Sequence, residues 1–369
     1  MRIDRIGLTN FRNFEAAQLV PSPGVNIFFG DNGAGKTNLL EAIFTLCLGR
    51  SQRGARDVML VREANGDYFR LEGDGVIGRA PSESRVKIAC AFQKGGRKKI
   101  TIDENPARIS KLYQLFRLVS MAPEDVSLFS GSPGVRRRFL DLHLSQASPN
   151  YLANLTDYNK ALAQKNSFLK NHPRGECPFD PLLVQLGAAI MKARHDFIRF
   201  LDAVSPGYYA RIAEGEIDSD SKPFAAEYKP NVEYESVEEI ADAFQTKLDA
   251  YRRKEEILET AVVGPHRDDI EFYIKEFPAK GYGSMGEQRS AAVSIMMGAS
   301  DFLEEKHDEK PILLLDEIFA ELDPTRREHL AILFSRFEQV FLTTAVKPPD
   351  ILFDSARIYR IAGGQILDD

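Results

Sequence analysis

The sequence predicts a mixed α/β fold built around a glycine-rich loop, with a second, mainly helical lobe and no long coiled coil. Three observations predict it. A short apolar run at residues 25–29 leads into the glycine-rich loop, and an amphipathic segment follows. A second apolar run, at residues 312–315, ends in two carboxylates. Between about residues 140 and 260, apolar side chains recur at helical rather than strand spacing.

Length and composition exclude several classes of protein. The 369 residues allow two domains or one large one. A net charge of -6 argues against a protein that coats DNA uniformly, although it permits local basic patches. No apolar run is long enough for a membrane span, and the first residues lack a signal-peptide pattern. Cys47, Cys90 and Cys177 have no metal-site spacing, so we expect a cytoplasmic protein.

The glycine-rich loop is the strongest motif. Residues 30–37 read G-D-N-G-A-G-K-T and match G-x-x-x-x-G-K-[ST] at every fixed position. In such loops the backbone N–H groups surround a polyphosphate, the lysine reaches the β- and γ-phosphates, and the hydroxyl binds Mg²⁺. The flanking strand and helix argue against a chance match. The predicted nucleotide-binding residues are Gly30, Asp31, Asn32, Gly33, Ala34, Gly35, Lys36, Thr37 and Asn38. Lys36 is also predicted to be catalytic, and Thr37 to be a metal ligand.

The segments around this loop follow from residue spacing. Apolar positions predict a strand near residues 3–8 and a helix over residues 38–46, which Gly49 is placed to cap. The expected apolar face of that helix is Leu39, Ile43 and Leu46. Residues 9–14 interleave polar and aromatic side chains, and residues 50–57 contain three arginines. For both segments two interpretations stay open: contact with nucleotide or nucleic acid, and an ordinary solvated turn.

Two basic clusters are candidates for contact with DNA. Alternating residues at 86–92 and 100–102 flank a Gly-Gly turn, which predicts a hairpin. Its tip carries Arg97, Lys98 and Lys99. The second cluster is Arg136, Arg137 and Arg138, at the expected start of a helix, where positive charge opposes the helix dipole. The alternatives are a solubilising role for the hairpin and a structural role for the arginines.

The middle of the chain is predicted to be mostly helical. Its periodic apolar positions are Leu152, Leu155, Leu162, Leu169, Ile190, Phe197, Leu201, Val204, Ile240, Phe244, Leu248 and Tyr251. Breaks containing proline and glycine are expected at residues 172–175 and 205–207. We therefore expect lobe I at residues 1–120 and 305–369, and lobe II at residues 121–304.

Residues 264–269 read G-P-H-R-D-D and are dense in polar groups. His266 with Asp268 suggests a metal site only weakly, because no second histidine is near. A structured turn that leads into a strand at residues 270–274 is favoured.

The apolar run at residues 312–315 continues into Asp316 and Glu317. We expect Asp316 to hold Mg²⁺ opposite Thr37, and Glu317 to act as a general base. Farther on, Asp323 can cap a helix that has Pro324 at its first position. Such a cap does not exclude a role for Asp323 in nucleotide binding across an interface.

Residues 283–289 read G-S-M-G-E-Q-R and precede an amphipathic helix. Ser284 and Glu287 form a capping box, and a glycine-flanked helix N-terminus is a natural anion site. The phosphate loop already covers one side of its nucleotide. We therefore expect Ser284, Gly286 and Gln288 to close over the γ-phosphate held by a neighbouring subunit.

Taken together, these motifs resemble the ABC-type ATPase head, which has a mixed sheet around the phosphate loop. The resemblance implies that two heads enclose two ATP molecules. Thr343 and Thr344 follow a predicted strand where transporter members carry a switch histidine, which disfavours a transporter subunit. No glutamine after the strand predicted at residues 118–122 is assigned as a Q-loop residue.

The chain more closely resembles the RecF family of bacterial DNA-repair ATPases. The resemblance is carried by residues 8–14, the phosphate loop, and residues 48–53, 123–125, 137–141, 264–269 and 283–289. It implies that Asn10 and Arg12 lie near the nucleotide and that Arg53 lies near phosphate. The signature reads Ser-Met-Gly-Glu-Gln, whereas the family often has Gln-Gln after the glycine, but Ser284, Gly286 and Gln288 are kept.

The resemblance implies a slow, DNA-stimulated ATPase that needs ATP and Mg²⁺. It implies a homodimer that closes on single-strand/double-strand DNA junctions or gaps when ATP binds. Hydrolysis would reset the dimer, which works with RecO and RecR to load recombinase in repair and replication restart. Two alternatives stay open: a module that ATP merely locks on DNA, and an ABC ATPase that does not act on DNA.

Overall fold

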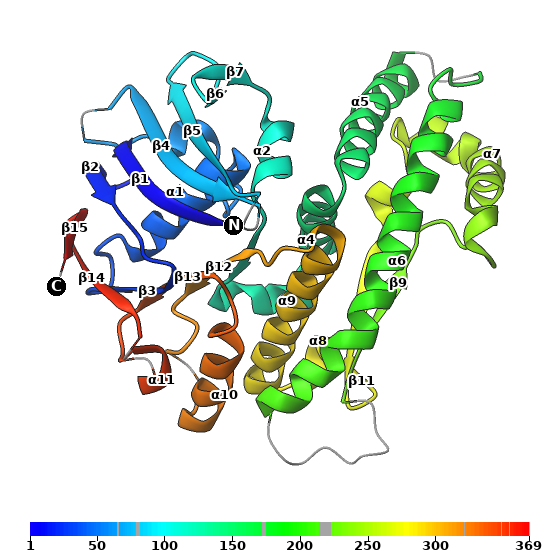
Figure 1. The fold of residues 1–369 in the computed structure, drawn as a ribbon. Coiled ribbons are helices and arrows are strands. Elements are labelled where there is room, and N and C mark those ends of the chain that lie inside the picture. The colour runs from blue at the N-terminus through cyan, green and yellow to red at the C-terminus, as the bar shows by residue number, and fades with distance from the viewer. Residues whose placement is uncertain are drawn as a thin grey trace. The chain divides into compact units, whose positions relative to one another are not determined.

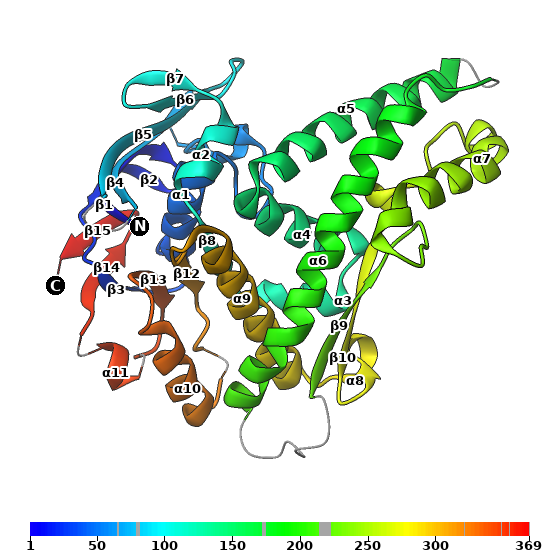
Figure 2. The same ribbon diagram turned by 45° about the vertical axis from the view of Figure 1, so that its right-hand side comes forward.

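The computed structural model describes residues 1–64, 66–78, 82–171, 175–213, 223–320, 322–347, 349–353 and 355–368. Backbone contacts divide the chain into two compact units. Unit 1 consists mainly of Met1–Asp125 and Ala299–Asp369, and unit 2 mainly of Val126–Ala210 and Gly215–Gly298. Strands dominate unit 1 and helices dominate unit 2 (Figures 1 and 2).

Unit 1 contains an antiparallel sheet with the strand order β2–β1–β4–β5–β6–β7. Its strands are β1 (Arg2–Phe11), β2 (Phe14–Leu19), β4 (Tyr68–Ile77), β5 (Ser84–Gln93), β6 (Lys99–Ile102) and β7 (Asn105–Ala107). The pairing of β5 with β6 confirms the predicted hairpin. Val86, Ile88 and Cys90 are buried at every second position of β5, as expected for a strand with one face on the core.

The second sheet of unit 1 has the order β15–β14–β3–β13–β12–β8, and only its β14–β15 pair is antiparallel. Its strands are β3 (Gly24–Phe29), β8 (Leu118–Met121), β12 (Ile312–Asp316), β13 (Gln339–Thr344), β14 (Arg357–Ala362) and β15 (Gln365–Asp368). All residues of β12 and β13 are buried, because both faces of a parallel sheet are covered. Phe29 pairs with Thr344 and Asp316 with Thr343, so β3, β12 and β13 end side by side.

The helix after the glycine-rich loop, α1 (Lys36–Leu48), contacts strands of both sheets (Figure 2). Residues 39–48 are all buried, so the buried surface of α1 is wider than the single apolar face expected from the sequence. A helix enclosed by two sheets buries its whole circumference. Gly49 caps α1 with φ 67°, as predicted. The other short helices of unit 1 are η1 (Asp57–Leu60), α2 (Ile109–Leu115), η2 (Pro123–Val126), α10 (Pro324–Phe334) and α11 (Asp350–Phe353).

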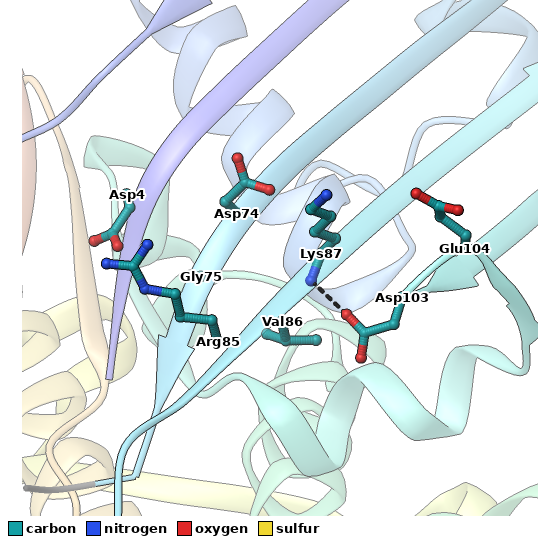
Figure 3. A pocket seen from close by; sticks show the side chains of 8 residues that line it. All are labelled: Asp4, Asp74, Gly75, Arg85, Val86, Lys87, Asp103 and Glu104. Carbon is teal, nitrogen blue, oxygen red and sulfur yellow. Dashed lines mark hydrogen bonds between the residues drawn. The ribbon is translucent and has the colours of Figure 1, made fainter.

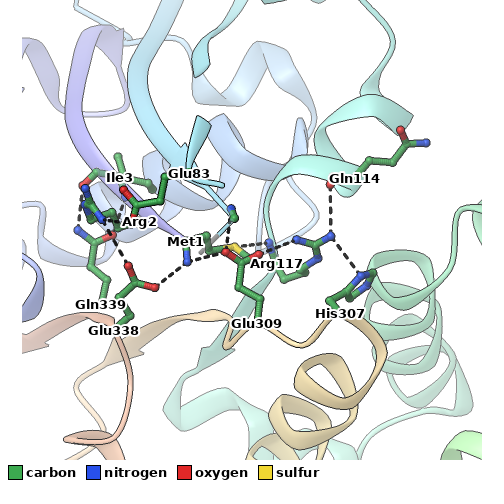
Figure 4. Close-up of polar contacts among 11 residues, drawn as sticks. Met1, Arg2, Ile3, Glu83, Gln114, Arg117, His307, Glu309, Glu338 and Gln339 are labelled. Atoms are coloured by element: carbon green, nitrogen blue, oxygen red, sulfur yellow. Dashed lines mark hydrogen bonds and ion pairs between the residues drawn. The ribbon is translucent and has the colours of Figure 1, made fainter. Parts of the chain in front are cut away.

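Polar contacts tie the start of β1 to the second sheet of unit 1 (Figure 4). The side-chain amide of Gln339 donates to the carbonyl of Ile3 and accepts from its N–H, both at 2.8 Å. The Met1 amino group pairs with Glu309 at 2.9 Å, and the same carboxylate pairs with Arg117 at 3.3 Å. These contacts fix the antiparallel sheet against the start of β13 and the segment that precedes β12.

Unit 2 combines long helices with a small antiparallel sheet ordered β11–β10–β9. Its helices are α3 (Ser127–Ser130), α4 (Pro133–Ala147), α5 (Pro149–Asn171), α6 (Asp180–Ala213), α7 (Ile240–Leu258), α8 (Ala279–Tyr282) and the larger part of α9 (Met285–His307). Its strands are β9 (Phe224–Lys229), β10 (Asp269–Ile274) and β11 (Phe277–Pro278), with short helices η3 (Val237–Glu239) and η4 (Pro265–Arg267). None of these helices continues into a long coiled coil within the described ranges.

One prediction about the helices of unit 2 is wrong. The break expected at residues 205–207 does not occur, because α6 continues through Pro206. Tyr208, Tyr209 and Ile212 are buried beyond the proline, so packing outweighs its local effect. Helix α5 confirms the helical spacing predicted around Leu155, and its buried side chains include Tyr158 and Lys165 rather than Leu155. Lys165 is buried because it pairs with Asp180 and Glu255 at 2.7 and 2.6 Å. Most of the other predicted break, residues 172–174, lies outside the described residues.

Candidate nucleotide-binding site

The loop of residues 30–35 connects β3 to α1, as predicted. Gly33 and Gly35 adopt φ values of 81° and 117°, which favour glycine. A Cβ atom on Gly35 would lie 2.4 Å from the Asn13 Nδ2 atom, and one on Gly30 would lie 2.3 Å from the Ile361 carbonyl oxygen. The fixed glycines of the motif are therefore required by the backbone path of this chain.

The side chain of Lys36 lies over the loop and is only 5% exposed. Its ammonium group donates to the carbonyl oxygens of Gly30 at 2.7 Å and Asp31 at 3.2 Å. It also pairs with Glu317 Oε1 at 2.9 Å. A buried cation thus lies over the loop, next to the carboxylate that was predicted to be the general base.

Thr37 and Asp316, the predicted metal ligands, lie in direct contact. The Thr37 hydroxyl donates to Asp316 Oδ1 at 3.0 Å, and the Thr343 hydroxyl donates to the same oxygen at 2.6 Å. Burial raises the pKa of Asp316, and the two hydroxyl hydrogen bonds oppose that rise. One hydroxyl and one carboxylate suit Mg²⁺, which binds hard oxygen donors and keeps several water ligands.

Glu317 follows the end of β12 with a positive φ of 48°, an uncommon conformation for a side-chain-bearing residue. Its N–H donates to the Thr343 carbonyl at 3.1 Å, and its Oε2 accepts from the Ala345 N–H at 3.0 Å. The end of β13 therefore orients the carboxylate toward Lys36. Sequence reasoning noted Thr343 only as a residue that is not histidine and missed this role.

A second set of contacts supports the loop from the turn between β1 and β2, from α1 itself and from the segment after α1. Asn13 Nδ2 donates to the Ala34 carbonyl at 3.0 Å, and Asn38 donates to Asn13 Oδ1 at 2.9 Å. The exposed Arg53 reaches Asn38 Oδ1 at 3.4 Å. Asn13 was not predicted as a site residue, although its position within the polar–aromatic segment at residues 9–14 was a usable signal.

The structure places Arg12 in an internal ion pair. Its Nε and Nη2 atoms donate to Glu41 at 2.8 and 3.1 Å, and its Nη1 donates to the Met59 carbonyl at 3.0 Å. Glu41 is fully buried on α1 and also accepts from Ser51 at 2.6 Å. Asn10 has a positive φ of 51°, and its backbone carbonyl accepts a hydrogen bond from the Arg62 N–H at 2.8 Å. Glu41 was missed because a glutamate inside an apolar helix looks unremarkable in sequence.

The signature segment lies in unit 2 and has the predicted capping box. The Ser284 hydroxyl and N–H both contact Glu287, at 2.9 and 3.0 Å, and the Glu287 N–H donates back to the hydroxyl at 3.3 Å. The hydrogen bond from the Ser284 N–H is the largest of the causes that lower the pKa of Glu287. Gln288 is buried and donates to the carbonyls of Ala279 and Gly283 at 3.1 and 3.0 Å. Ser284 is exposed and Gly286 partly exposed at the start of α9, whereas the amide of Gln288 is turned inward.

Asp323 caps α10, as predicted. Its side chain accepts from the Arg326 N–H at 3.0 Å, and Pro324 occupies the first position of the helix. The side chain is half exposed, so the cap leaves part of the carboxylate accessible.

The three consecutive arginines do not share one surface. Arg136 is buried, pairs with Asp269 and donates to the carbonyls of Leu128 and Gly131. Arg137 donates to the Asp268 carbonyl at 2.7 Å, and Arg138 is exposed. Consecutive side chains on a helix point about 100° apart, which separates the three charges.

At the hairpin tip, Arg97 and Lys99 are exposed, as is Lys94. Lys98 is partly buried and pairs with Asp57 at 2.6 Å. The exposed part of the tip therefore keeps most of the positive charge that the sequence placed there.

Residues 264–269 form the structured turn that was favoured. Asp268 is fully buried, pairs with Arg194 at 2.9 Å, and accepts from Tyr228 and from the Asn231 N–H. His266 contacts the Tyr158 hydroxyl at 2.8 Å, and burial lowers the pKa of its imidazole to about 4. No group of three or more His, Cys, Asp or Glu side chains that could hold a metal ion occurs among the described residues.

A hollow of about 520 Å³ lies on the antiparallel sheet of unit 1 (Figure 3). It is lined by Asp4, Asp74, Gly75, Arg85, Val86, Lys87, Asp103 and Glu104. Four carboxylates against two cations make it unfavourable for a polyphosphate, and no residue of the glycine-rich loop lines it. The nucleotide-binding candidate is therefore the loop itself, as the motif predicts.

Comparison with known proteins decides the family. The model of the RecF/RecN/SMC N-terminal domain matches residues 2–361. A DNA replication and repair protein RecF from Latilactobacillus sakei is 32% identical over 100% of this chain and 99% of its own length. The chain belongs to the RecF family. RecF proteins from Geobacillus thermodenitrificans and Streptococcus pneumoniae are each 34% identical, over 99% and 93% of this chain and 99% and 92% of their own lengths.

Solved structures agree with this assignment. Two are described as the recombination mediator protein RecF of the RecFOR pathway, one with ATP and one with ATPrS. They match 100% and 99% of this chain and 97% of their own, at 29% identity, with TM-scores of 0.88 and 0.85. An Smc head, at 15% identity and a TM-score of 0.55 over 100% of this chain and 96% of its own, shares the fold. The predicted ABC-type head with a helical lobe is thus confirmed. None of the helices in the described part of the chain is long and apolar enough to cross a membrane.

Proposed function

We propose that this RecF-family chain is a cytoplasmic, ATP-dependent DNA-binding ATPase of recombinational repair and replication restart. One observation carries the proposal: Lys36 and Thr37 at the loop meet Glu317 and Asp316 at the end of β12, at 2.9 and 3.0 Å. A phosphate loop, a cation, a hydroxyl and two carboxylates are the parts that phosphoryl transfer from Mg-ATP uses. The RecF structures described with ATP and ATPrS support ATP as the nucleotide.

Each residue then has a distinct task. Lys36 binds the β- and γ-phosphates, and Thr37 and Asp316 hold Mg²⁺, which neutralises phosphate charge when bound. Phosphate at Lys36 competes with Glu317 Oε1 for the ammonium group. Glu317, still held at Oε2 by the Ala345 N–H, is then free to accept a proton from the attacking water.

The signature supports an ATP-dependent homodimer. In this proposal lobe I, residues 1–120 and 305–369, binds ATP, and lobe II, residues 121–304, presents the signature to the ATP of a second copy. Ser284 and Gly286 supply the exposed helix N-terminus. Gln288 stabilises the segment before that N-terminus by hydrogen bonds to the carbonyls of Ala279 and Gly283. Hydrolysis opens the dimer and resets it on DNA.

We propose Arg97, Lys99 and Arg138 as the exposed DNA contacts, because Lys98, Arg136 and Arg137 are held by protein groups. Single-strand/double-strand junctions are the proposed DNA, and RecO and RecR the proposed partners. The RecFOR pathway named for the solved relatives supports this assignment.

Steady-state ATP hydrolysis, measured with and without gapped DNA, tests the enzymatic part of the proposal. DNA-stimulated hydrolysis that Lys36→Ala abolishes is expected. A wild-type protein that binds ATP and DNA but turns over no faster with DNA would favour a module that ATP only locks on DNA.

Salt-dependent DNA binding tests the rest. Replacing Arg97, Lys99 and Arg138 by glutamine is expected to weaken binding and to reduce the salt slope by about one per lost phosphate contact. Lys160→Gln, which replaces an exposed lysine on α5, is the control. Undetectable DNA binding by the wild type at low salt would favour an ABC ATPase that does not act on DNA.

A further inference from the structure

A recess of about 130 Å³ lies in unit 2, where α4, α5 and α6 meet the turn at residues 264–266. Pockets that enclose a whole small-molecule ligand typically measure about 300–1,000 Å³. One water molecule takes about 30 Å³ of liquid volume, so the recess has room for one compact group but not for a nucleoside. The polar part of its wall consists of Arg137, Asp141, Tyr158, Asn159, Arg194 and His266.

Arg137 is a cation of this wall with unused hydrogen-bond donors. It is partly buried on α4, and its Nη1 atom donates to the Asp268 carbonyl at 2.7 Å. A guanidinium carries several N–H donors, and among the described residues no other acceptor binds those of Arg137. The remaining donors are therefore available to a group that enters the recess.

The charges around Arg137 leave its positive charge incompletely balanced. Burial and then the charge of Arg194 lower the pKa of Arg137, and the nearby carboxylates oppose these two effects without cancelling them. Asp141, the carboxylate in the wall, is already paired with Arg194 at 2.9 Å. Arg194 is buried and also pairs with Asp268 at 2.9 Å, so it serves the protein itself. An anion in the recess would supply the charge that Arg137 lacks.

The rest of the wall is neutral. The Ala261 carbonyl can only accept, so His266 donates to it from Nε2 at 3.2 Å and accepts from the Tyr158 hydroxyl at Nδ1, at 2.8 Å. Burial lowers the pKa of His266 to about 4, which keeps the imidazole uncharged near pH 7. Asn159 is exposed, so its amide offers a further donor at the open side. A neutral wall around one arginine suits an oxyanion, because a guanidinium fork matches two phosphate oxygens.

We infer that this recess binds the terminal phosphate of a nucleic-acid strand, with Arg137 and Asn159 as its hydrogen-bond donors. A phosphate inside a strand carries a sugar on each side and cannot enter a recess that excludes a nucleoside, whereas a strand end can enter with its free oxygens first. A phosphate monoester also carries about 1.5–2 negative charges at pH 7, more than a phosphodiester. The inference rests on the proposed function, because Arg138, the next residue of α4, is a proposed DNA contact.

The experiment measures binding of gapped DNA by fluorescence anisotropy in Mg-ATPγS. The strand ends at the gap carry a 5′-phosphate, a 3′-phosphate or only hydroxyls, and hairpin loops close all other ends. Charge-assisted hydrogen bonds commonly change affinity by about tenfold or more, so wild type should bind one phosphate-ended DNA about tenfold more tightly than hydroxyl-ended DNA. The arm that shows the preference identifies which strand end is bound.

Three variants locate the preference. Arg137→Gln should abolish it and keep the affinity for hydroxyl-ended DNA within about twofold. Asn159→Ala, a change at an exposed side chain, should reduce the preference by severalfold without disturbing the fold. Arg138→Gln is the matched control and should weaken binding of all three DNAs by the same factor, which leaves the preference intact.

The outcomes separate this inference from the proposed function. A wild type that binds gapped DNA equally with and without a terminal phosphate would refute the strand-end site and leave the proposed DNA binding intact. If inorganic phosphate then raised the melting temperature of ADP-bound wild type but not of Arg137→Gln, the recess would be assigned to free phosphate instead. A preference that survives in folded Arg137→Gln and Asn159→Ala would also refute the site. A wild type that binds none of the DNAs would overturn the proposed DNA binding and the strand-end site together.

Discussion

Thr343→Val tests how the end of β13 controls the nucleotide site. The substitution keeps the shape of a buried side chain but removes a hydroxyl that donates to Asp316 at 2.6 Å and accepts from the Glu317 N–H at 3.2 Å. Asp316 then keeps one hydroxyl partner, Thr37. We expect the variant to fold and to lose stability in a way that depends on pH.

The pH dependence follows from the pKa of Asp316. Burial raises that pKa above its usual value, and the Thr343 hydrogen bond opposes the rise. An acid with a raised folded-state pKa binds more protons when folded, so the free energy of unfolding falls as pH rises through the interval between the unfolded and folded values. Removing the hydroxyl raises the folded pKa further, and the loss is therefore larger at neutral pH than in acid.

The expected magnitudes come from the charge state of the acceptor. A hydrogen bond to a charged group contributes about 1.5–3 kcal/mol, and one to a neutral group about 0.5–1.5 kcal/mol. We expect Thr343→Val to lower the free energy of unfolding by about 2 kcal/mol at pH 7.5, and by about 1 kcal/mol at the lowest pH at which the wild type is folded.

Urea unfolding at both pH values measures this difference, with equal m values confirming that the same transition is compared. Thr343→Ser keeps the hydroxyl and is the control. A loss below about 0.5 kcal/mol at pH 7.5, or an equal loss at both pH values, would show that the hydroxyl does not stabilise the ionised carboxylate of Asp316.

Four further changes test the site and unit 2. Lys36→Ala should remove productive ATP binding and ATP-induced dimerisation in a nucleotide titration; unchanged affinity with normal dimerisation would contradict the loop assignment. Glu317→Gln should lower the hydrolysis rate by about 10²–10⁴ and accumulate an ATP-bound dimer on size-exclusion chromatography, and near-normal turnover would remove it as the base. Ser284→Arg should bind ATP yet stay monomeric in the same assay, whereas a variant that dimerises and hydrolyses normally would make this motif only a helix cap. His266→Gln should reduce the pH dependence of the free energy of unfolding between about pH 4 and 6.5. The pKa of His266 is lowered in the folded protein, so the unfolded state binds more protons in this range. The wild type therefore loses stability as pH falls through it. An unchanged slope in urea unfolding would contradict the burial of a neutral His266.

Features that depend on neighbouring residues could be predicted from the sequence. The strand–loop–helix around Gly33 and Gly35, the cap at Gly49, the hairpin, the capping box at Ser284 and the cap at Asp323 all agree with the structure. In each of these, residues within a few positions of one another supply both the conformation and its hydrogen bonds. The family could also be recognised, because the motifs keep their order along the chain.

Tertiary structure decided which distant groups share a partner. Thr37 and Asp316 are 279 residues apart, yet they meet because β3, β13 and β12 are adjacent parallel strands. The same adjacency brings in Thr343, which no local pattern marks.

Burial was decided in the same way. Arg136 turns inward because Asp269 and two carbonyls receive its guanidinium, and Arg138, two positions on, stays exposed. Helix α6 passes through Pro206 because the residues beyond it are packed. The residue type determines which hydrogen bonds and ion pairs a side chain can form. The free energy of burying that side chain depends on whether partners are present, and only the folded tertiary structure brings those partners together.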